Sequence, residues 1–158
     1  MSYASLRDFI DELERTDRLV RVSHPVSTVL EMTEIQTRLL AEQGPAVLFE
    51  NVSRDDGMRS DMPVLVNLFG TVDRVAAGMG RTPDALRGLG ETLAILRQPE
   101  PPDGIRDAID KLPLLKSALS MRPKTVSHAA CHDVIWQGEE IDLAKLPVQT
   151  CWPGEPAP

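Results

Sequence analysis

The alternation of apolar and polar residues predicts a small sheet flanked by helices. Two largely apolar runs, residues 46–49 and 64–69, each follow a proline, and Gly70 closes the second. Runs of this kind, bounded by Gly and Pro, are typical of strands buried on both faces. The segment between them, residues 53–61, is charged and contains a glycine, so we expect an exposed turn there.

Helical periodicity precedes the two predicted strands. An N-terminal helix presents one apolar face: Leu6, Phe9, Ile10 and Leu13. Residues 19–22 are typical of a short strand, which His24-Pro25 ends because proline donates no hydrogen bond. Thr28 and Glu31 are spaced as a capping box for a second helix. That helix has its own apolar stripe: Met32, Ile35, Leu39 and Leu40.

Helical patterns also follow the second predicted strand. Residues 71–79 predict a short helix that ends at Gly80. Thr82-Pro83 then begins another helix, with a hydroxyl N-cap and a proline in the first turn. Its apolar stripe is leucine throughout: Leu86, Leu89, Leu93 and Leu96.

Proline usage divides the chain near residue 98. Four of the thirteen prolines precede this position and nine follow it, so the later part is less regular. We predict an N-terminal α/β domain over residues 1–98, a proline-rich connector with a helix over 99–125, and a further domain beginning at 126. In the connector the helix is indicated by Ile105, Ile109 and Leu112. In the last part the elements expected are a strand over Val126–Gln137 and a turn capped by Asp142.

Composition narrows the class of protein. The chain has 158 residues, 42% of them hydrophobic and 26% charged, as in globular domains. Its net charge of −7 argues against nucleic acid or an anionic membrane as the main partner. Two cysteines, Cys131 and Cys151, form no disulfide framework and favour a reducing cytoplasm. We recognise no signal peptide and no apolar run long enough for a membrane span.

One group of soft ligands invites a metal or nucleophile hypothesis: His128, Cys131, His132 and Cys151. A structural zinc needs four converging ligands at paired spacing, and Cys151 is isolated. A Cys–His nucleophile would need a third, orienting group that the spacing does not supply. Packing and surface roles are therefore favoured for these residues.

Three further patterns have ordinary explanations that we favour. The glycines of residues 78–83 imitate a phosphate-binding loop, but a helix C-cap followed by an N-cap explains them. The carboxylates of Glu139, Glu140 and Asp142 beside Gly138 are typical of a solvated loop. Trp136 and Trp152 are suited to stacking on a ring, although burial in a core or an interface is favoured.

Seven segments, in chain order, resemble the beginning of a UbiD-type decarboxylase. They are residues 6–10, 44–51, 62–71, 74–80, 99–102, 110–113 and 146–153. Two phrases, Phe49-Glu50-Asn51 and Cys151-Trp152-Pro153, resemble most the branch that acts on 4-hydroxy-3-polyprenylbenzoate in ubiquinone biosynthesis. The resemblance covers the whole chain, and ordered phrases are more specific than any single motif above.

This resemblance implies that the intact protein is a non-oxidative carboxy-lyase. Members of the family use prenylated FMN with a divalent metal, usually Mn²⁺, and K⁺, and the modified ring acts as an electron sink for a small aromatic carboxylic acid. The enzyme implied is a cytoplasmic homo-oligomer that binds no nucleic acid. Peripheral contact with the inner membrane follows only by analogy, from the greasy substrate of the ubiquinone branch.

The resemblance assigns no catalytic, cofactor-binding or metal-binding residue to this chain. In the family those residues follow the equivalent of Cys151-Trp152-Pro153, in a central split-barrel flavin-binding domain. We therefore expect residues 126–158 to be the truncated start of that barrel, with an exposed strand edge and apolar surface around Trp136 and Trp152. The chain alone is expected to bind no cofactor and to be inactive. The alternative is a stand-alone, non-catalytic interaction or regulatory domain derived from that family.

Overall fold

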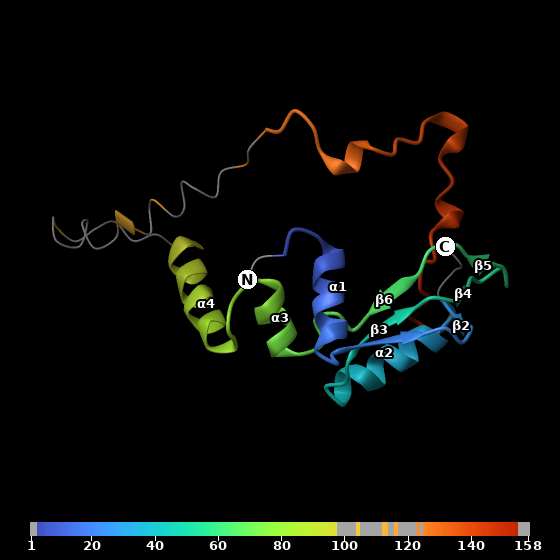
Figure 1. Ribbon diagram of the computed structural model, residues 1–158, viewed down its shortest axis with the longest axis horizontal. Coiled ribbons are helices and arrows are strands. Elements are labelled where there is room, and N and C mark those ends of the chain that lie inside the picture. The colour runs from blue at the N-terminus through green and yellow to red at the C-terminus, as the bar shows by residue number, and fades with distance from the viewer. Residues whose placement is uncertain are drawn as a thin grey trace. The chain divides into compact units, whose positions relative to one another are not determined.

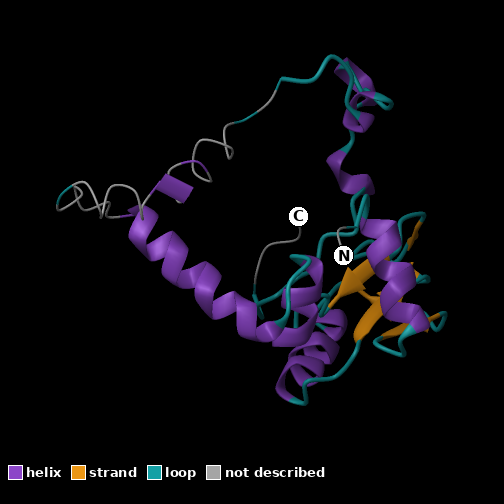
Figure 2. Ribbon diagram, turned by 60° about the vertical axis from the view of Figure 1, so that its left-hand side comes forward, coloured by secondary structure: helices purple, strands orange, loops and turns teal. Residues whose placement is uncertain are grey.

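The computed structural model describes residues 3–97, 104, 112–113, 116, 123 and 125–154 (Figure 1). The chain divides into two compact units, one formed by Met1–Pro83 with Ile141–Pro158 and the other by Asp84–Glu140. The strands of the described residues all belong to the first unit, where helices flank them (Figure 2). This mixture of helices and strands confirms the predicted α/β class. The domain boundaries at residues 98 and 126 stay predictions.

A three-stranded sheet lies at the centre of the first unit. Its spatial order is β1 (Leu19–Val22), β3 (Ala46–Phe49) and β6 (Val64–Val66). β1 runs parallel to β3, and β6 runs antiparallel to it. Every residue of β3 is buried, as its continuous apolar run predicts. The predicted strand over 64–69 is confirmed only for its first half, because Asn67 adopts a left-handed backbone with φ of 54°.

The helix α1 (Leu6–Arg15) covers one face of this sheet. Ser5 caps it through a complete capping box: the Ser5 hydroxyl accepts from the Asp8 N–H, and the Asp8 carboxylate accepts from the Ser5 N–H. Because side chains alternate along a strand, the even-numbered residues of β3 face α1. The cluster on this side consists of Phe9, Leu13, Leu19, Ala46 and Leu48.

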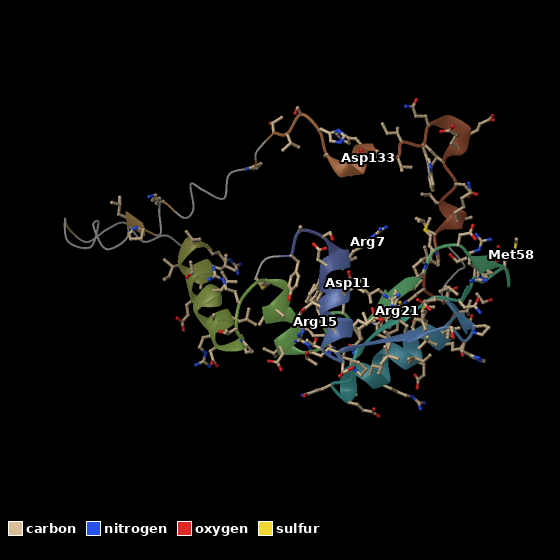
Figure 3. All side chains as sticks on the ribbon, in the orientation of Figure 1. Arg7, Asp11, Arg15, Arg21, Met58 and Asp133 are labelled. Carbon is tan, nitrogen blue, oxygen red and sulfur yellow. The ribbon has the colours of Figure 1, made fainter. Side chains whose placement is uncertain are left out.

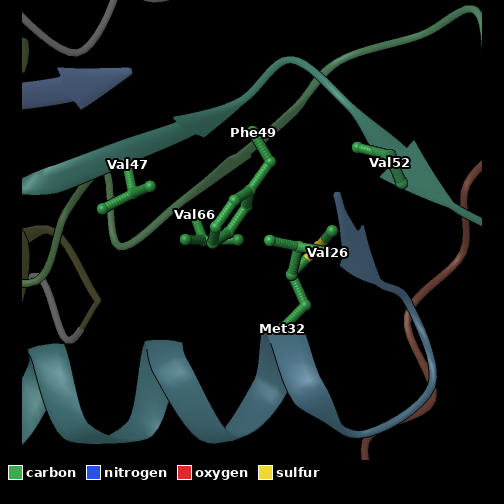
Figure 4. Packing of buried hydrophobic residues seen from close by; sticks show 6 residues of the cluster. All are labelled: Val26, Met32, Val47, Phe49, Val52 and Val66. Atoms are coloured by element: carbon green, nitrogen blue, oxygen red, sulfur yellow. The ribbon is translucent and has the colours of Figure 1, made fainter. Parts of the chain in front are cut away.

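The helix α2 (Glu31–Ala41) packs against the odd-numbered side chains of β3 (Figure 4). The cluster consists of Val26, Met32, Val47, Phe49, Val52 and Val66. Of the predicted stripe, Ile35 and Leu39 pack on this cluster, whereas Leu40 is exposed. The predicted capping box is wrong, because α2 begins after Leu30 and the Glu31 carboxylate accepts from the Ser27 N–H at 2.7 Å.

A second small sheet includes part of the stretch predicted as a plain turn, residues 53–61. It consists of β2 (Val26–Ser27), β4 (Val52–Ser53) and β5 (Arg59–Ser60) in that order. β4 and β5 form a hairpin with Met58 near its tip (Figure 3). Its charged turn is exposed, as predicted, but Ser60 is buried. The sequence pattern did not reveal strands of two residues.

The α-helices α3 and α4 follow β6 along the chain. In α3 (Val72–Gly78), the Thr71 hydroxyl caps the first turn by accepting from the Arg74 N–H at 3.3 Å. The helix α4 (Pro83–Arg97) begins at the predicted proline and contains all four leucines of the predicted stripe. None of its side chains, all of which the structure describes, is buried. No helix within the described part of the chain is long and apolar enough to cross a bilayer.

The strand predicted over Val126–Gln137 is wrong. Residues 125–154 contain instead three short 3₁₀ helices, η1 (Ala130–His132), η2 (Gly138–Glu140) and η3 (Leu143–Lys145). Val134, Ile135 and Trp136 were the strongest strand signal, but the described residues provide them with no pairing strand, and all three are exposed. The expected exposed apolar surface is present without the expected strand edge. The helix predicted around Ile105 and Ile109 lies outside the described residues.

Candidate functional site

The histidines and cysteines singled out from the sequence do not form a centre. His128 Nε2 lies 3.4 Å from Oδ1 of Asp133 (Figure 3), and both side chains are largely exposed. Cys131 and Cys151 are exposed and form no disulfide, and His132 lies beside Cys131 on η1. Within the residues that the structure describes, no three His, Cys, Asp or Glu side chains are placed to hold a metal ion.

The carboxylates around Gly138 have local roles. Glu140 Oε2 accepts from the Gln137 N–H at 3.2 Å, and Asp142 Oδ1 accepts from the Ala144 N–H at 3.1 Å. The second contact caps η3, as predicted. Trp136 and Trp152 are exposed, so neither lies in a core, and the predicted alternative of burial in an interface stays a prediction.

The glycine-rich residues 78–83 end one helix and begin the next, rather than forming a phosphate-binding loop. The Gly80 N–H donates to Ala77 O at 2.9 Å and the Arg81 N–H to Ala76 O at 2.8 Å. With Gly80 at φ of 65°, this pair of bonds is a Schellman motif that ends α3. This confirms the C-cap of the favoured explanation. α4 then begins at Pro83, and the Thr82 N-cap stays a prediction.

Among the described residues, the most buried ionisable side chain is that of Arg74, which is 3% exposed. It stands in the first turn of α3, and its guanidinium reaches three main-chain carbonyls. Nε donates to Leu68 O at 3.0 Å, and Nη2 donates to Gly44 O at 2.9 Å and to Asn67 O at 3.0 Å. Burial, and secondly the charge of Arg18, lower the pKa of Arg74. These contacts tie the approach to β3 to the exit from β6.

Asn67 completes this arginine junction, which we define as Arg74, Asn67 and the carbonyls that they bind. The Asn67 side-chain amide donates to Gly44 O at 3.1 Å and to Pro45 O at 2.9 Å. Gly70 is required beside it, because a Cβ there would lie 1.8 Å from Asn67 Oδ1. Since its donors are directed at main-chain carbonyls, the junction holds backbone in place rather than presenting a reactive group.

The second notable arrangement is a strap, residues 141–154, that returns to the small sheet. The Thr150 N–H donates to Thr28 O at 3.0 Å, and Thr150 O accepts from the Leu30 N–H at 3.3 Å. These bonds form an isolated parallel bridge between Val29 and Thr150, in the connection between β2 and α2. Arg54 Nη1 donates to Ala144 O at 2.7 Å, a second contact along the strap.

A known protein family matches the part of the chain that contains the central sheet. Residues 10–93, more than half of the chain, match the family model described as the 3-octaprenyl-4-hydroxybenzoate carboxy-lyase N-terminal domain, UbiD_N. The chain belongs to the UbiD family. This finding confirms the resemblance, and the matched range contains both the sheet and the arginine junction.

One solved structure is similar to part of this chain. It is an evolved dimeric form of the UbiD-class enzyme HmfF from Pelotomaculum thermopropionicum, in complex with prFMN. The match has 26% sequence identity and a TM-score of 0.47, and it covers 63% of this chain and 21% of that chain. The chain therefore spans about a fifth of the length of that protein.

Sequence reasoning missed both the arginine junction and the strap of this UbiD-family chain. Arg74 appeared in the family phrase 74–80, but nothing in its spacing marks it as buried. A usable signal was the phrase Asn67-Leu68-Phe69-Gly70, since Asn favours a left-handed backbone and Gly allows close approach. For the strap no local signal exists, because Thr150 contacts residues about 120 positions earlier.

Proposed function

We propose that this chain is the N-terminal part of a prenylated-FMN-dependent, non-oxidative decarboxylase. Membership of the UbiD family is the observation that carries the proposal. We further propose that the intact protein acts on 4-hydroxy-3-polyprenylbenzoate or a related aromatic acid in ubiquinone biosynthesis. The phrases Phe49-Glu50-Asn51 and Cys151-Trp152-Pro153 support this choice of branch.

The residues described here do not fit a flavin or metal site. Their His, Cys, Asp and Glu side chains do not converge in threes, and the polar contacts of the arginine junction are directed at carbonyls. We therefore assign no step of catalysis to this chain. In the proposal, prenylated FMN, Mn²⁺ and K⁺ bind to the intact protein through residues outside this sequence.

Within the intact enzyme this chain would serve as a scaffold. Both faces of the central sheet are already covered by α1 and α2, so the first unit has its own core. Scaffolding of this kind would pack on the cofactor domain and shape the approach to it. A cytoplasmic homo-oligomer with peripheral contact to the inner membrane is part of the same proposal.

The test begins with the genomic reading frame beyond codon 158. We expect it to continue into a barrel-encoding sequence. The whole frame, expressed in cells that make prenylated FMN, should then release CO₂ from 4-hydroxy-3-polyprenylbenzoate or a related aromatic acid. Residues 1–158 expressed alone are the control and should release none.

Two outcomes would contradict the proposal. A native stop codon after residue 158 would favour the alternative, a non-catalytic interaction or regulatory domain. Saturable binding of prenylated FMN by residues 1–158 alone would also contradict it, because that result would place the cofactor site inside this chain.

A further inference from the structure

The start of α2 lacks the side-chain cap that most helices have. Its N-cap residue is Leu30, whose side chain offers no oxygen and whose backbone is left-handed, with φ of 61° and ψ of −32°. A non-glycine residue in this conformation is costly, of order 1 kcal/mol or more. The conformation persists only where surrounding contacts hold it in place.

The strap supplies those contacts. Thr150 O accepts from the Leu30 N–H at 3.3 Å and also from the Thr33 hydroxyl at 3.1 Å. One carbonyl from outside the helix therefore binds both the N-cap residue and the residue three positions later. A capping box links the same two positions by a side chain from within the helix.

The strap is held mainly through its backbone. Thr150 is 9% exposed and Thr28, which accepts its N–H, is 1% exposed. The Thr28 N–H in turn donates to Ser53 O at 2.9 Å, so the residue is paired on both sides. Apolar side chains of the strap, in contrast, are exposed: Ile141, Leu143, Leu146, Val148 and Trp152. This is the pattern of an added strand, where main-chain bonds give the affinity.

A second contact secures the strap six residues earlier. Arg54 Nη1 donates to Ala144 O at 2.7 Å, while Arg54 Nη2 binds Asp56 Oδ2 at 2.7 Å. The ion pair with Asp56 fixes the guanidinium on the β4–β5 turn. The strap is thus attached at both Ala144 and Thr150 to the small sheet and to α2.

We propose that residues 28–33, which connect β2 to the first turn of α2, form a docking site for an extended segment, filled here by residues 144–150. We further propose that this strap and the first turn of α2 form and open together as one latch. The Thr150 peptide group is its centre, and Arg54 is its second attachment. The latch does not depend on the proposed decarboxylase function. In the latch, the strap supplies a carbonyl that binds Leu30 and Thr33 at the start of α2, where no side chain caps the helix.

Native-state hydrogen exchange on the full chain tests the latch at single amides. The two reporters are the Leu30 and Thr150 N–H groups, which donate across the latch in opposite directions. Thr33→Val removes one hydroxyl contact to Thr150 O and keeps the side-chain shape. It should speed the exchange of both amides by the same factor, about fivefold, the worth of one neutral hydrogen bond. Arg54→Met should speed the same two amides by about tenfold, because its contact is charged.

Each variant has a matched control. Thr37→Val removes a hydroxyl bonded to Thr33 O on the same helix, and Arg59→Met changes an exposed arginine on the neighbouring strand β5. Neither should alter the exchange of the two reporters. The amides of β3 should also keep their wild-type rates in all four variants, which shows that the sheet stays folded.

Several results would overturn the latch. One is a Thr150 amide that exchanges at the rate of an unstructured chain in the wild type. Another is a change of only one reporter in Thr33→Val or Arg54→Met, since the two sides would then open separately. Equal acceleration of the β3 amides would show that the strap opens only with the whole unit.

Discussion

Two amphipathic helices of this chain have similar sequence patterns and different surroundings. α1 places Phe9 and Leu13 in the core, where Leu13 is completely buried. α4 repeats leucine at helical spacing over a longer stretch, yet Leu93 is 51% exposed and none of its side chains is buried. The period of the apolar residues predicts the helix in both cases. Burial also needs a partner surface, which the central sheet provides for α1.

The central sheet explains the difference for α1. β3 projects alternate side chains to both faces, so a helix on either face finds a ready apolar surface. Residues 125–140 contain apolar side chains that are exposed, and Val134 is 72% exposed. In this molecule, tertiary contacts rather than the local sequence pattern decide which apolar side chains are buried in the core.

The sharpest test of this comparison removes one leucine from each helix. Leu13→Ala should lower the free energy of unfolding by about 3 kcal/mol, because it leaves a cavity under a fully buried side chain. Leu93→Ala makes the same chemical change on an exposed position and should cost no more than about 0.5 kcal/mol. Urea denaturation followed by circular dichroism measures both. Equal costs would show that α4 buries its leucines in solution.

The next largest effect concerns a buried arginine of α3 and an exposed arginine of α4. Arg74→Met should cost about 2 kcal/mol, because Leu68 O loses its buried guanidinium donor and the neighbouring carbonyls of the arginine junction lose theirs. Arg87→Met on α4 is the matched control and should stay within about 0.5 kcal/mol. The same urea series compares them. An unchanged stability of Arg74→Met would mean that water replaces the guanidinium at these carbonyls.

The parts of the fold that sequence alone predicted are those governed by local pattern. The N-terminal helix, the strand at residues 19–22 and the buried run at 46–49 needed only periodicity and proline placement. α4 needed only its Thr82-Pro83 start and its leucines. These features depend on neighbours within a few positions, which a sequence reveals directly.

The parts that sequence did not predict depend on distant partners. The false strand at 126–137 had the residues of a strand, but a strand also needs another strand to bind its backbone. The α2 cap was assigned to Thr28 within the local sequence, whereas Thr150, far along the chain, supplies the carbonyl. Nothing in the local sequence distinguished Arg74 from a surface arginine, because its burial depends on carbonyls such as Gly44 O and Leu68 O that only the fold brings beside it.

The smallest expected effect concerns an ionic contact that ties α1 to the sheet and has a pH dependence. Arg21 of β1 (labelled in Figure 3) binds Glu14 Oε1 through Nε at 2.7 Å and Glu50 Oε1 through Nη1 at 3.0 Å. The hydrogen bond from Arg21 lowers the pKa of Glu14 below its ordinary value of 4.5; burial opposes this shift, and the charge of Arg21 adds to it. The unfolded chain therefore binds a proton more readily than the folded one as the pH falls.

A carboxylate with a lowered pKa stabilises the fold above its unfolded pKa and loses that contribution as the solution is acidified. Glu14→Gln should therefore have a lower urea midpoint than the wild type at pH 7, and the gap should close as the pH falls below 4.5. Asp11→Asn changes another carboxylate of α1 and controls for a general loss of negative charge on the helix. Because the side chains of Glu14 and Arg21 are both partly exposed, the difference in urea midpoint should be small and should narrow in high salt. A gap that stays constant from pH 7 to pH 2 would show that Glu14 stabilises α1 through packing of its methylenes rather than through its charge.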